Sequence, residues 1–389
     1  MAKLTLNEEL FGDLLPLIKD DNITDINFNG EELWVNDLNN GRYKITNITL
    51  DELFIKNFAQ RISNITKENF NKYSPLLEGE TDTLRVSILH KDVTNTGYSV
   101  SIRKTPPTRR IEKNKMVKEK YCTSDFDNFM ANAVLCGLNV IVCGLPGTGK
   151  TEYVKYLTRY IPPHEKAITI EDNLEIRYRE INPGKDCVEL KVSDTMDYDA
   201  AIKASMRQLP TWILLSEARS VEIEELLKSM STGTHCLTTI HTDDVRKIPD
   251  RVRNMSKSVN INDVYTFLDI GILITSKVDS SGKITRKITQ AGFITRDNEK
   301  DENNIVIFYE DGKILTHTLP DDIKRKMELR GILNPFEENK NVEKISNLIN
   351  TKEIKLEKKN KPLKIEEKDN TKIKEEKEKG EENGDKETK

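Results

Sequence analysis

The segment from residue 140 to residue 154, VIVCGLPGTGKTEYV, constrains this chain more than any other stretch. Its four apolar residues 140–143 predict a short buried strand, and residues 152–160 predict a helix that ends before Pro162. The turn between them fits the pattern G-x-x-x-x-G-K-[ST]. The glycines let backbone N–H groups converge on an anion at the start of the helix, where the helix dipole is positive. The segment therefore predicts a phosphate-binding loop.

The residues of this turn have separate expected roles. Lys150 is expected to reach the β- and γ-phosphates of a nucleotide, and the hydroxyl of Thr151 is expected to coordinate Mg²⁺. ATP and Mg²⁺ are therefore the predicted cofactors. The residues expected to bind the nucleotide are Gly144, Leu145, Pro146, Gly147, Thr148, Gly149, Lys150 and Thr151.

Strand and helix patterns alternate from residue 121 to residue 300. The apolar runs NVIVC, AITI, VELKV, TWILLS, HCLTTIH and IGILITS each predict a strand. This alternation predicts an α/β fold, a RecA-like P-loop domain with a mostly parallel sheet wrapped by helices. Residues 1–104 predict a smaller α+β N-terminal domain, with strands on both sides of the Asn29-Gly30 turn and two more at LRVSI and YSVSIRK.

Three other segments complete the predicted organisation. Residues 105–120 are basic and include Pro106 and Pro107, which predicts an extended, solvated linker; a surface that faces phosphate or lipid is the alternative. Residues 301–350 predict a pair of strands followed by helices. Residues 351–389 are nearly all charged or polar, which predicts a disordered tail.

Charge and cysteine content exclude several classes of protein. The chain has 61 Lys and Arg against 65 Asp and Glu, a formal net charge of −4, which argues against a dedicated duplex-binding protein. We therefore expect no direct sequence-specific binding of nucleic acid. The sequence contains no apolar run long enough for a membrane span, and its first residues lead us to expect no secretory signal. The five cysteines form no C-x-x-C pair, which predicts reduced thiols in a cytoplasmic protein.

Polar side chains stand at the ends of three predicted strands. Glu171 follows AITI, Glu217 comes two residues after WILL, and His241 ends HCLTTIH. Because the carboxyl ends of parallel strands face the ligand crevice, we expect these side chains near the phosphate loop. Glu217 is suited to orient or activate a water molecule and to contact Mg²⁺. For the AITI strand end an alternative stays open, in which Asp172 caps a helix, and a single histidine is often structural.

Four segments carry a resemblance to a known family. GLPGTGKT, TIEDNLEI, TWILLSEAR and STGTHCLTTIHT occur in the order and at the separations of the Walker A, Asp, Walker B and His boxes. They resemble the secretion ATPase superfamily, which drives type II secretion, type IV pili, tight-adherence pili and type IV secretion. In the N-terminal part ITDINFNG, LRVSI and VSIRK also resemble this superfamily, so the likeness covers about residues 10–300.

The chain departs from the usual family pattern at three places. Glu152 replaces a common threonine, Ser216 replaces a glycine before Glu217, and TGTH replaces TGH, which leaves the role of His235 open. The tetracysteine module of some type II members is absent. That absence favours the shorter branch, of the tight-adherence pilus and conjugation kind.

The resemblance implies a homo-hexamer with nucleotide between the two domains, where N-terminal arginines reach phosphate. The matching candidates are Arg85 and Arg103, which alternation places on the polar faces of two strands. If these strands pair, the two guanidinium groups share a face, which is unfavourable unless an anion joins them. The box residues Arg219 and His241 are the other catalytic candidates. Glu171 is expected to assist through Mg²⁺-bound water, with Glu175 near it.

The function implied is an ATP-hydrolysing motor, cytoplasmic and peripherally associated with the cytoplasmic membrane. Its partner would be a membrane platform protein of a secretion or pilus machine, and its hydrolysis would move the N-terminal domain. A conjugative DNA-transfer ATPase of the same superfamily is the alternative. An AAA+ remodelling ATPase would normally place Asp before Glu after the Walker B strand, and WILLSEAR has no such Asp. A small-molecule kinase and an inactive scaffold are further alternatives, and the scaffold would not need Lys150, Thr151 and Glu217.

Overall fold

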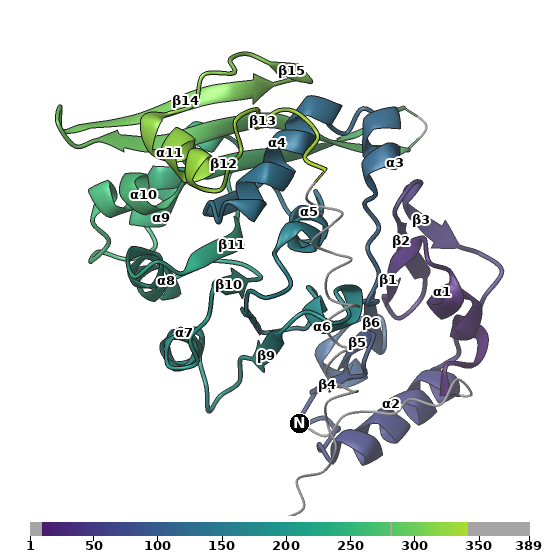
Figure 1. Cartoon of the computed structure of the whole chain (residues 1–389). Helices are drawn as coiled ribbons and strands as arrows, with labels where there is room; N and C mark the ends of the chain where they lie inside the picture. The colour runs from purple at the N-terminus through teal and green to yellow at the C-terminus, as the bar shows by residue number, and fades with distance from the viewer. Residues whose placement is uncertain (1–9, 281, 341–389) are drawn as a thin grey trace, which may run out of the picture. The chain divides into compact units, whose positions relative to one another are not determined.

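The computed structural model describes residues 10–280 and 282–340, which build two β-sheets and their helices (Figure 1). The chain therefore has an α/β fold. The predicted tail at 351–389 and the last ten residues of the predicted 301–350 segment lie outside the described residues. Among the described residues no helix is both long enough and apolar enough to cross a bilayer.

The first sheet is antiparallel throughout and has the strand order β3-β2-β1-β6-β5-β4. Its apolar face packs on helix α2, whose Ile55, Phe58 and Ile62 repeat at helical spacing and are buried. The strands are β1 (Ile23–Phe28), β2 (Leu33–Asp37), β3 (Gly41–Ile45), β4 (Leu76–Glu80), β5 (Leu84–Leu89) and β6 (Ser99–Lys104). The helices are η2 (Gly12–Leu14), α1 (Leu15–Lys19), α2 (Glu52–Thr66) and η3 (Lys91–Val93). All four strands predicted here form, including the pair on either side of Asn29-Gly30.

The second sheet has nine strands in the order β15-β14-β13-β12-β7-β11-β10-β8-β9. The six predicted strands appear as β7 (Val140–Cys143), β8 (Ala167–Glu171), β9 (Cys187–Lys191), β10 (Trp212–Leu215), β11 (His235–Ile240) and β12 (Ile270–Val278). They pair in parallel from β12 across to β9. The remaining strands are β13 (Ile284–Asp297), β14 (Glu302–Glu310) and β15 (Lys313–Ile314).

The prediction of a mostly parallel sheet needs correction, because the sheet is mixed. Strands β12 to β15 pair antiparallel to one another. Short turns join these strands, and a turn of a few residues can only connect antiparallel neighbours. The strand pair predicted after residue 300 is present as β14 and β15, and it continues this same sheet.

Helices cover both faces of the second sheet (Figure 1). Alternate residues of each strand point to opposite sides: Val140 and Val142 of β7 join the core formed with α4, α5 and α11, whereas Ile141 and Cys143 join the core formed with α7 to α10. The helices are α3 (Lys113–Lys118), α4 (Ser124–Leu135), α5 (Lys150–Leu157), η4 (Thr158–Tyr160), α6 (Tyr178–Ile181), α7 (Tyr198–Met206), α8 (Glu222–Ser231), η5 (Val245–Lys247), α9 (Ile248–Arg253), α10 (Ile261–Phe267) and α11 (Asp321–Leu329).

The basic segment 105–120 is not wholly solvated. It includes α3, whose Met116 is buried in the core with α4 and α5. Before α3, the Arg109 guanidinium donates a hydrogen bond to the side chain of Asn182 and approaches the Lys155 carbonyl oxygen at 3.4 Å. These contacts attach the segment to the P-loop helix α5.

Candidate active site

The phosphate loop joins the carboxyl end of β7 to the start of α5. All three of its glycines have positive φ angles: 151° at Gly144, 78° at Gly147 and 91° at Gly149. At Gly144 a Cβ atom would lie 2.4 Å from the carbonyl oxygen of Ile274. Only glycine fits there, so the sequence pattern follows from backbone geometry. Helix α5 begins at Lys150, two residues earlier than expected, so its N-terminus opens directly onto the loop.

The ammonium group of Lys150 lies against this loop. Its Nζ donates hydrogen bonds to the carbonyl oxygens of Gly144 at 3.1 Å and Leu145 at 3.3 Å. Nζ is also 3.2 Å from Nδ1 of His241. Burial lowers the pKa of Lys150, and the nearby negative charge of Glu217 opposes that shift. A compact, partly desolvated cation thus sits where the loop would hold a phosphate.

Glu217 and His241 meet at the carboxyl edge of the parallel strands. Glu217 Oε1 is 2.6 Å from His241 Nε2, and its carboxylate is only 15% exposed. A carboxylate only accepts hydrogen bonds, so His241 Nε2 donates to Glu217, while Nδ1 lies 3.2 Å from both Lys150 Nζ and the Gly144 carbonyl oxygen. Two strand ends and the phosphate loop are thereby linked in one line of hydrogen bonds.

Arg219 extends this line to a third strand end. Its Nε is 2.8 Å from Oε2 of Glu217, and its NH1 is 3.1 Å from Oδ2 of Asp172, directly after β8. The sequence named Arg219 as a catalytic candidate and left Asp172 open between the ligand crevice and a helix cap. The carboxylate of Glu217 is therefore held from both sides, by an imidazole and by a guanidinium group.

Glu171 lies beneath the loop that follows β8. Its carboxylate is fully buried, and Oε2 accepts hydrogen bonds from the backbone N–H groups of Glu175 at 2.8 Å and Ile176 at 2.9 Å. Burial raises the pKa of Glu171 to about 8, although these two hydrogen bonds oppose the shift. These contacts fix the shape of the loop at residues 172–176.

Glu175 is the carboxylate that this loop brings to Thr151. Burial raises the pKa of Glu175, while the charge of Arg103 and a hydrogen bond from the Thr151 hydroxyl lower it. The sequence placed Glu175 only near Glu171 and gave it no contact of its own. A hydroxyl and a carboxylate beside the phosphate loop are oxygen donors of the kind that Mg²⁺ prefers.

Arg85 and Arg103 lie directly opposite each other on β5 and β6, as the alternation predicted if the strands paired. Each guanidinium group has a carboxylate of its own within the sheet. Arg103 Nε is 2.9 Å from Asp25 Oδ1, and Arg85 NH2 is 3.5 Å from Glu78 Oε1. These carboxylates offset part of the repulsion between the two guanidinium groups. From the sequence we expected a bound anion to do this.

Both arginines line a small pocket of about 40 Å³ together with the loop after β8. Glu175 and Arg177 line the same pocket. The hydrogen bond to Asp25 raises the pKa of Arg103, and the charge of Glu175 adds to this effect. The positive charge of Arg103 thus acts on Glu175, and Glu175 accepts a hydrogen bond from the Thr151 hydroxyl. In this way the first sheet contributes positive charge close to Thr151.

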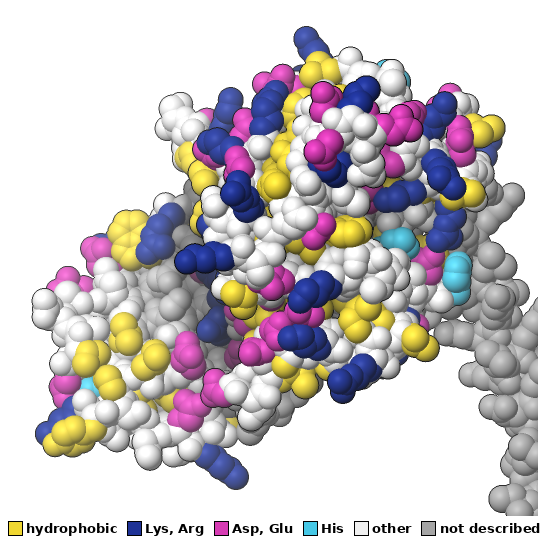
Figure 2. Space-filling view, turned by 90° about the vertical axis from the view of Figure 1, so that its left-hand side faces the viewer, with side chains coloured by type: hydrophobic (Ala, Val, Ile, Leu, Met, Phe, Trp, Pro, Cys, Tyr) yellow, Lys and Arg dark blue, Asp and Glu magenta, His cyan; other side chains and the backbone are white. Residues whose placement is uncertain are grey.

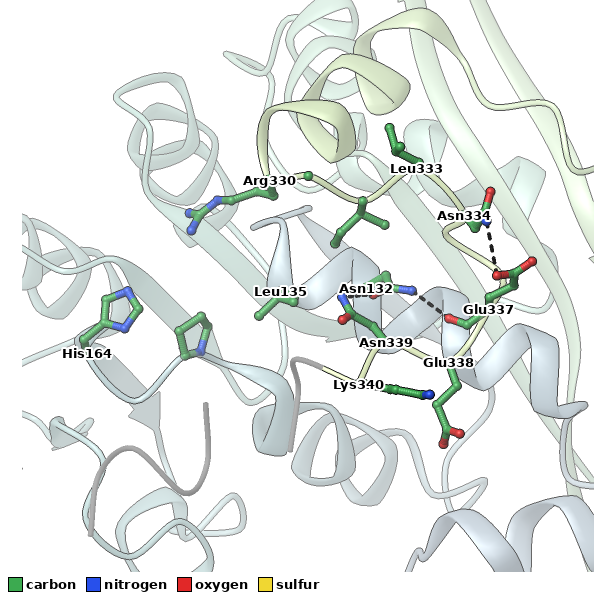
Figure 3. A pocket seen from close by; sticks show the side chains of 13 residues that line it. Asn132, Leu135, His164, Arg330, Leu333, Asn334, Glu337, Glu338, Asn339 and Lys340 are labelled. Atoms are coloured by element: carbon green, nitrogen blue, oxygen red, sulfur yellow. Dashed lines mark hydrogen bonds between the residues drawn. The ribbon is translucent and has the colours of Figure 1, made fainter. Parts of the chain in front are cut away.

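A larger pocket, of about 330 Å³, lies away from the phosphate loop (Figure 3). Asn132 of α4 lines this pocket, and its side-chain amide donates a hydrogen bond to the carbonyl oxygen of Glu337 (Figure 3). The same amide donates to the carbonyl oxygen of Pro335. Arg330 and Lys340 are among its other residues.

On the face shown in Figure 2, acidic and basic side chains are interspersed.

Comparison with known proteins assigns the family. Residues 76–361 match the family described as type II/IV secretion system protein. The chain belongs to this family. An uncharacterized protein of Bacillus anthracis is 26% identical over 287 residues, which are 70% of this chain and 65% of that protein. This chain thus covers less than two thirds of the length of that relative.

Solved structures share the fold at low sequence identity. The Yersinia pseudotuberculosis ATPase DotB matches with a TM-score of 0.58 at 14% identity, over 90% of this chain and 88% of that one. The pilus retraction motor PilT, solved with bound ADP, matches with a TM-score of 0.53 at 16% identity, over 75% of this chain and 84% of that one.

Proposed function

We propose that this protein is an ATP-hydrolysing motor of a secretion or pilus-assembly machine. The observation that carries the proposal is the hydrogen-bonded line from Lys150 through His241 and Glu217 to Arg219, at the carboxyl edge of the sheet. Family membership supports the same conclusion. A phosphate loop alone would fit any nucleotide-binding protein. The Glu217 carboxylate held next to the loop can also act as a base toward water, which favours a protein that hydrolyses the nucleotide.

ATP is bound by the backbone N–H groups of the loop and by the N-terminus of α5. Lys150 turns from the loop carbonyls toward the β- and γ-phosphates, where its charge is more strongly stabilised than against neutral oxygens. Arg103 and Arg85 add positive charge from the first sheet. Catalysis then rests on positioning and on charge stabilisation at phosphorus.

The residues fit a bound Mg²⁺. Thr151 supplies a hydroxyl oxygen and Glu175 a carboxylate in contact with it, while Glu217 supplies a second carboxylate at the same edge. When bound, the metal neutralises phosphate charge. Glu217 accepts the proton of the attacking water, and His241 and Arg219 keep its carboxylate in place. Glu171 acts through the loop that carries Glu175.

Family membership supports a proposal for the assembly and its partners. We infer a homo-hexamer at the cytoplasmic face of a membrane, docked on a platform protein of the machine. Residues 10–104 would act as a smaller N-terminal domain that changes position as nucleotide is bound and hydrolysed, because their arginines share a pocket with Glu175.

The test is phosphate release by the purified full-length chain. We expect hydrolysis of ATP that requires Mg²⁺, together with binding of ADP. A protein that binds no adenine nucleotide would contradict the phosphate-site assignment. Binding without any turnover would contradict the motor and favour a scaffold.

A further inference from the structure

Arg286 on β13 touches the phosphate loop and the first sheet at the same time. Its Nε donates to the carbonyl oxygen of Gly147 at 3.3 Å, and its NH1 donates to the carbonyl oxygen of Leu38 at 3.0 Å. Gly147 is in the phosphate loop, and Leu38 is in the turn between β2 and β3. A single guanidinium group thus bridges two segments that are 109 residues apart in the sequence.

The contact at Gly147 controls the orientation of a peptide in the phosphate loop. In a trans peptide the C=O and the N–H point in opposite directions. Because Arg286 holds the Gly147 carbonyl on the outside, the N–H of Thr148 points into the turn, where it lies 3.4 Å from the Leu145 carbonyl oxygen. Loop N–H groups directed inward are the ones that bind phosphate.

The contact at Leu38 is part of a rigid junction. Asp37 Oδ1 accepts hydrogen bonds from the N–H groups of Asn39 and Asn40, both at 2.7 Å, which fixes the turn. The Ile284 N–H, on the other side of the junction, donates to the Asn39 carbonyl oxygen at 3.0 Å. A Cβ atom at Gly41 would lie 2.8 Å from the Gly282 carbonyl oxygen, so the two backbones approach closely.

We propose that Arg286 is a positioning residue that couples the phosphate loop to the turn between β2 and β3. When phosphate binds, the loop peptides reorient toward it, and the guanidinium group transmits the change to the Leu38 carbonyl. Arginine suits this position because its planar group presents separate donors to two acceptors, which a lysine ammonium on a flexible stem does less well. The proposal rests on ATP being bound at the loop, as proposed above.

The experiment measures hydrogen exchange of the full-length chain with and without Mg²⁺-ADP. In the wild-type protein we expect ADP to change exchange at the amides of Asn39, Asn40 and Ile284. In Arg286→Met we expect that change to disappear, and kcat for ATP to fall about 5- to 10-fold, on the scale of one lost charge-assisted hydrogen bond. Arg286→Lys keeps the charge and should lose most of the response, which covers the case that the methionine variant does not fold.

The matched control is Lys287→Met, the next residue of β13. Lys287 pairs with Asp311 at 2.8 Å, on the other side of the strand, so its loss should leave both kcat and the exchange response unchanged. The proposal is overturned if Arg286→Met or Arg286→Lys binds ADP and still shows the wild-type response at Asn39 and Ile284. If the wild-type protein itself binds no ADP, the proposed function fails first, and the two failures are therefore distinguishable.

Discussion

The two sheets place charge at the candidate site in different ways. In the large sheet Glu217 and His241 follow the carboxyl ends of β10 and β11, and parallel pairing alone brings them to one edge. In the first sheet Arg85 and Arg103 lie within β5 and β6 and meet only because the antiparallel register sets them opposite each other. Strand-end residues are thus fixed by topology, whereas mid-strand residues depend on register.

The comparison also separates chemical roles. The large sheet supplies the phosphate loop, its lysine and the carboxylate beside it, so changes there should stop turnover. The first sheet supplies two guanidinium groups, of Arg85 and Arg103, which line a pocket together with Glu175. Changes there should slow turnover without abolishing binding.

The largest effect is expected from Lys150→Ala in the large sheet. The variant loses the cation that we propose to meet the β- and γ-phosphates, so phosphate release should fall by about 10²-fold or more. Lys228→Ala is the control, because Lys228 is an exposed lysine paired with Glu225 at 2.5 Å on α8. Near-normal turnover by Lys150→Ala with an unchanged melting temperature would remove the phosphate assignment.

A smaller effect is expected from Arg103→Ala in the first sheet. In the proposed site the guanidinium group would meet phosphate charge best in the transition state, so kcat should fall about 10-fold with KM nearly unchanged. Arg85→Ala should act in the same direction. Arg42→Ala on β3 removes an exposed guanidinium group from the same sheet, beside Trp34 and not at the pocket, and should leave kcat unchanged. Unaltered turnover in both Arg103→Ala and Arg85→Ala would exclude the first sheet from the chemistry.

The smallest effect is expected on stability, at Glu171. Its pKa is about 8 in the folded protein against an ordinary value of 4.5. The folded state therefore binds more protons than the unfolded state between these values, and the free energy of unfolding falls as pH rises from about 4.5 to 8. Glu171→Gln keeps an acceptor for the Glu175 and Ile176 N–H groups and does not titrate.

Denaturant unfolding at pH 5 and pH 8 checks this sign. The wild-type protein should lose free energy of unfolding between pH 5 and pH 8, and Glu171→Gln should not. The free energy of unfolding of Glu171→Gln relative to the wild type should therefore rise by about 1 kcal/mol or more from pH 5 to pH 8. An equal stability difference at both pH values would mean that Glu171 titrates normally in the folded protein.

The sequence predicted the strand ends better than the loops between them. Each of the six apolar runs became a strand, and parallel order alone brought Glu217 and His241 together. The contact between Glu175 and Thr151 was missed because the loop shape depends on hydrogen bonds that the buried Glu171 accepts.

The antiparallel half of the large sheet was also harder to predict. Strand β13 begins with ITRKITQ, in which charged and polar residues obscure the alternation, because one side of this stretch is only partly buried. Because β13 was not predicted, the sequence did not indicate that the sheet is mixed or that Arg286 contacts the phosphate loop.

The most direct test of the account compares single-turnover hydrolysis of bound ATP in Glu217→Gln and Glu171→Gln. Glu217→Gln keeps its shape beside His241 and Arg219 but loses the basic oxygen, so it should bind ATP and hydrolyse it more slowly by about 10²-fold or more. Glu171→Gln should slow hydrolysis less, because the Glu171 side chain contacts the backbone of the loop after β8 and not the phosphate. If Glu171→Gln is inactive and Glu217→Gln hydrolyses ATP freely, the two carboxylates have the opposite roles and the account is contradicted.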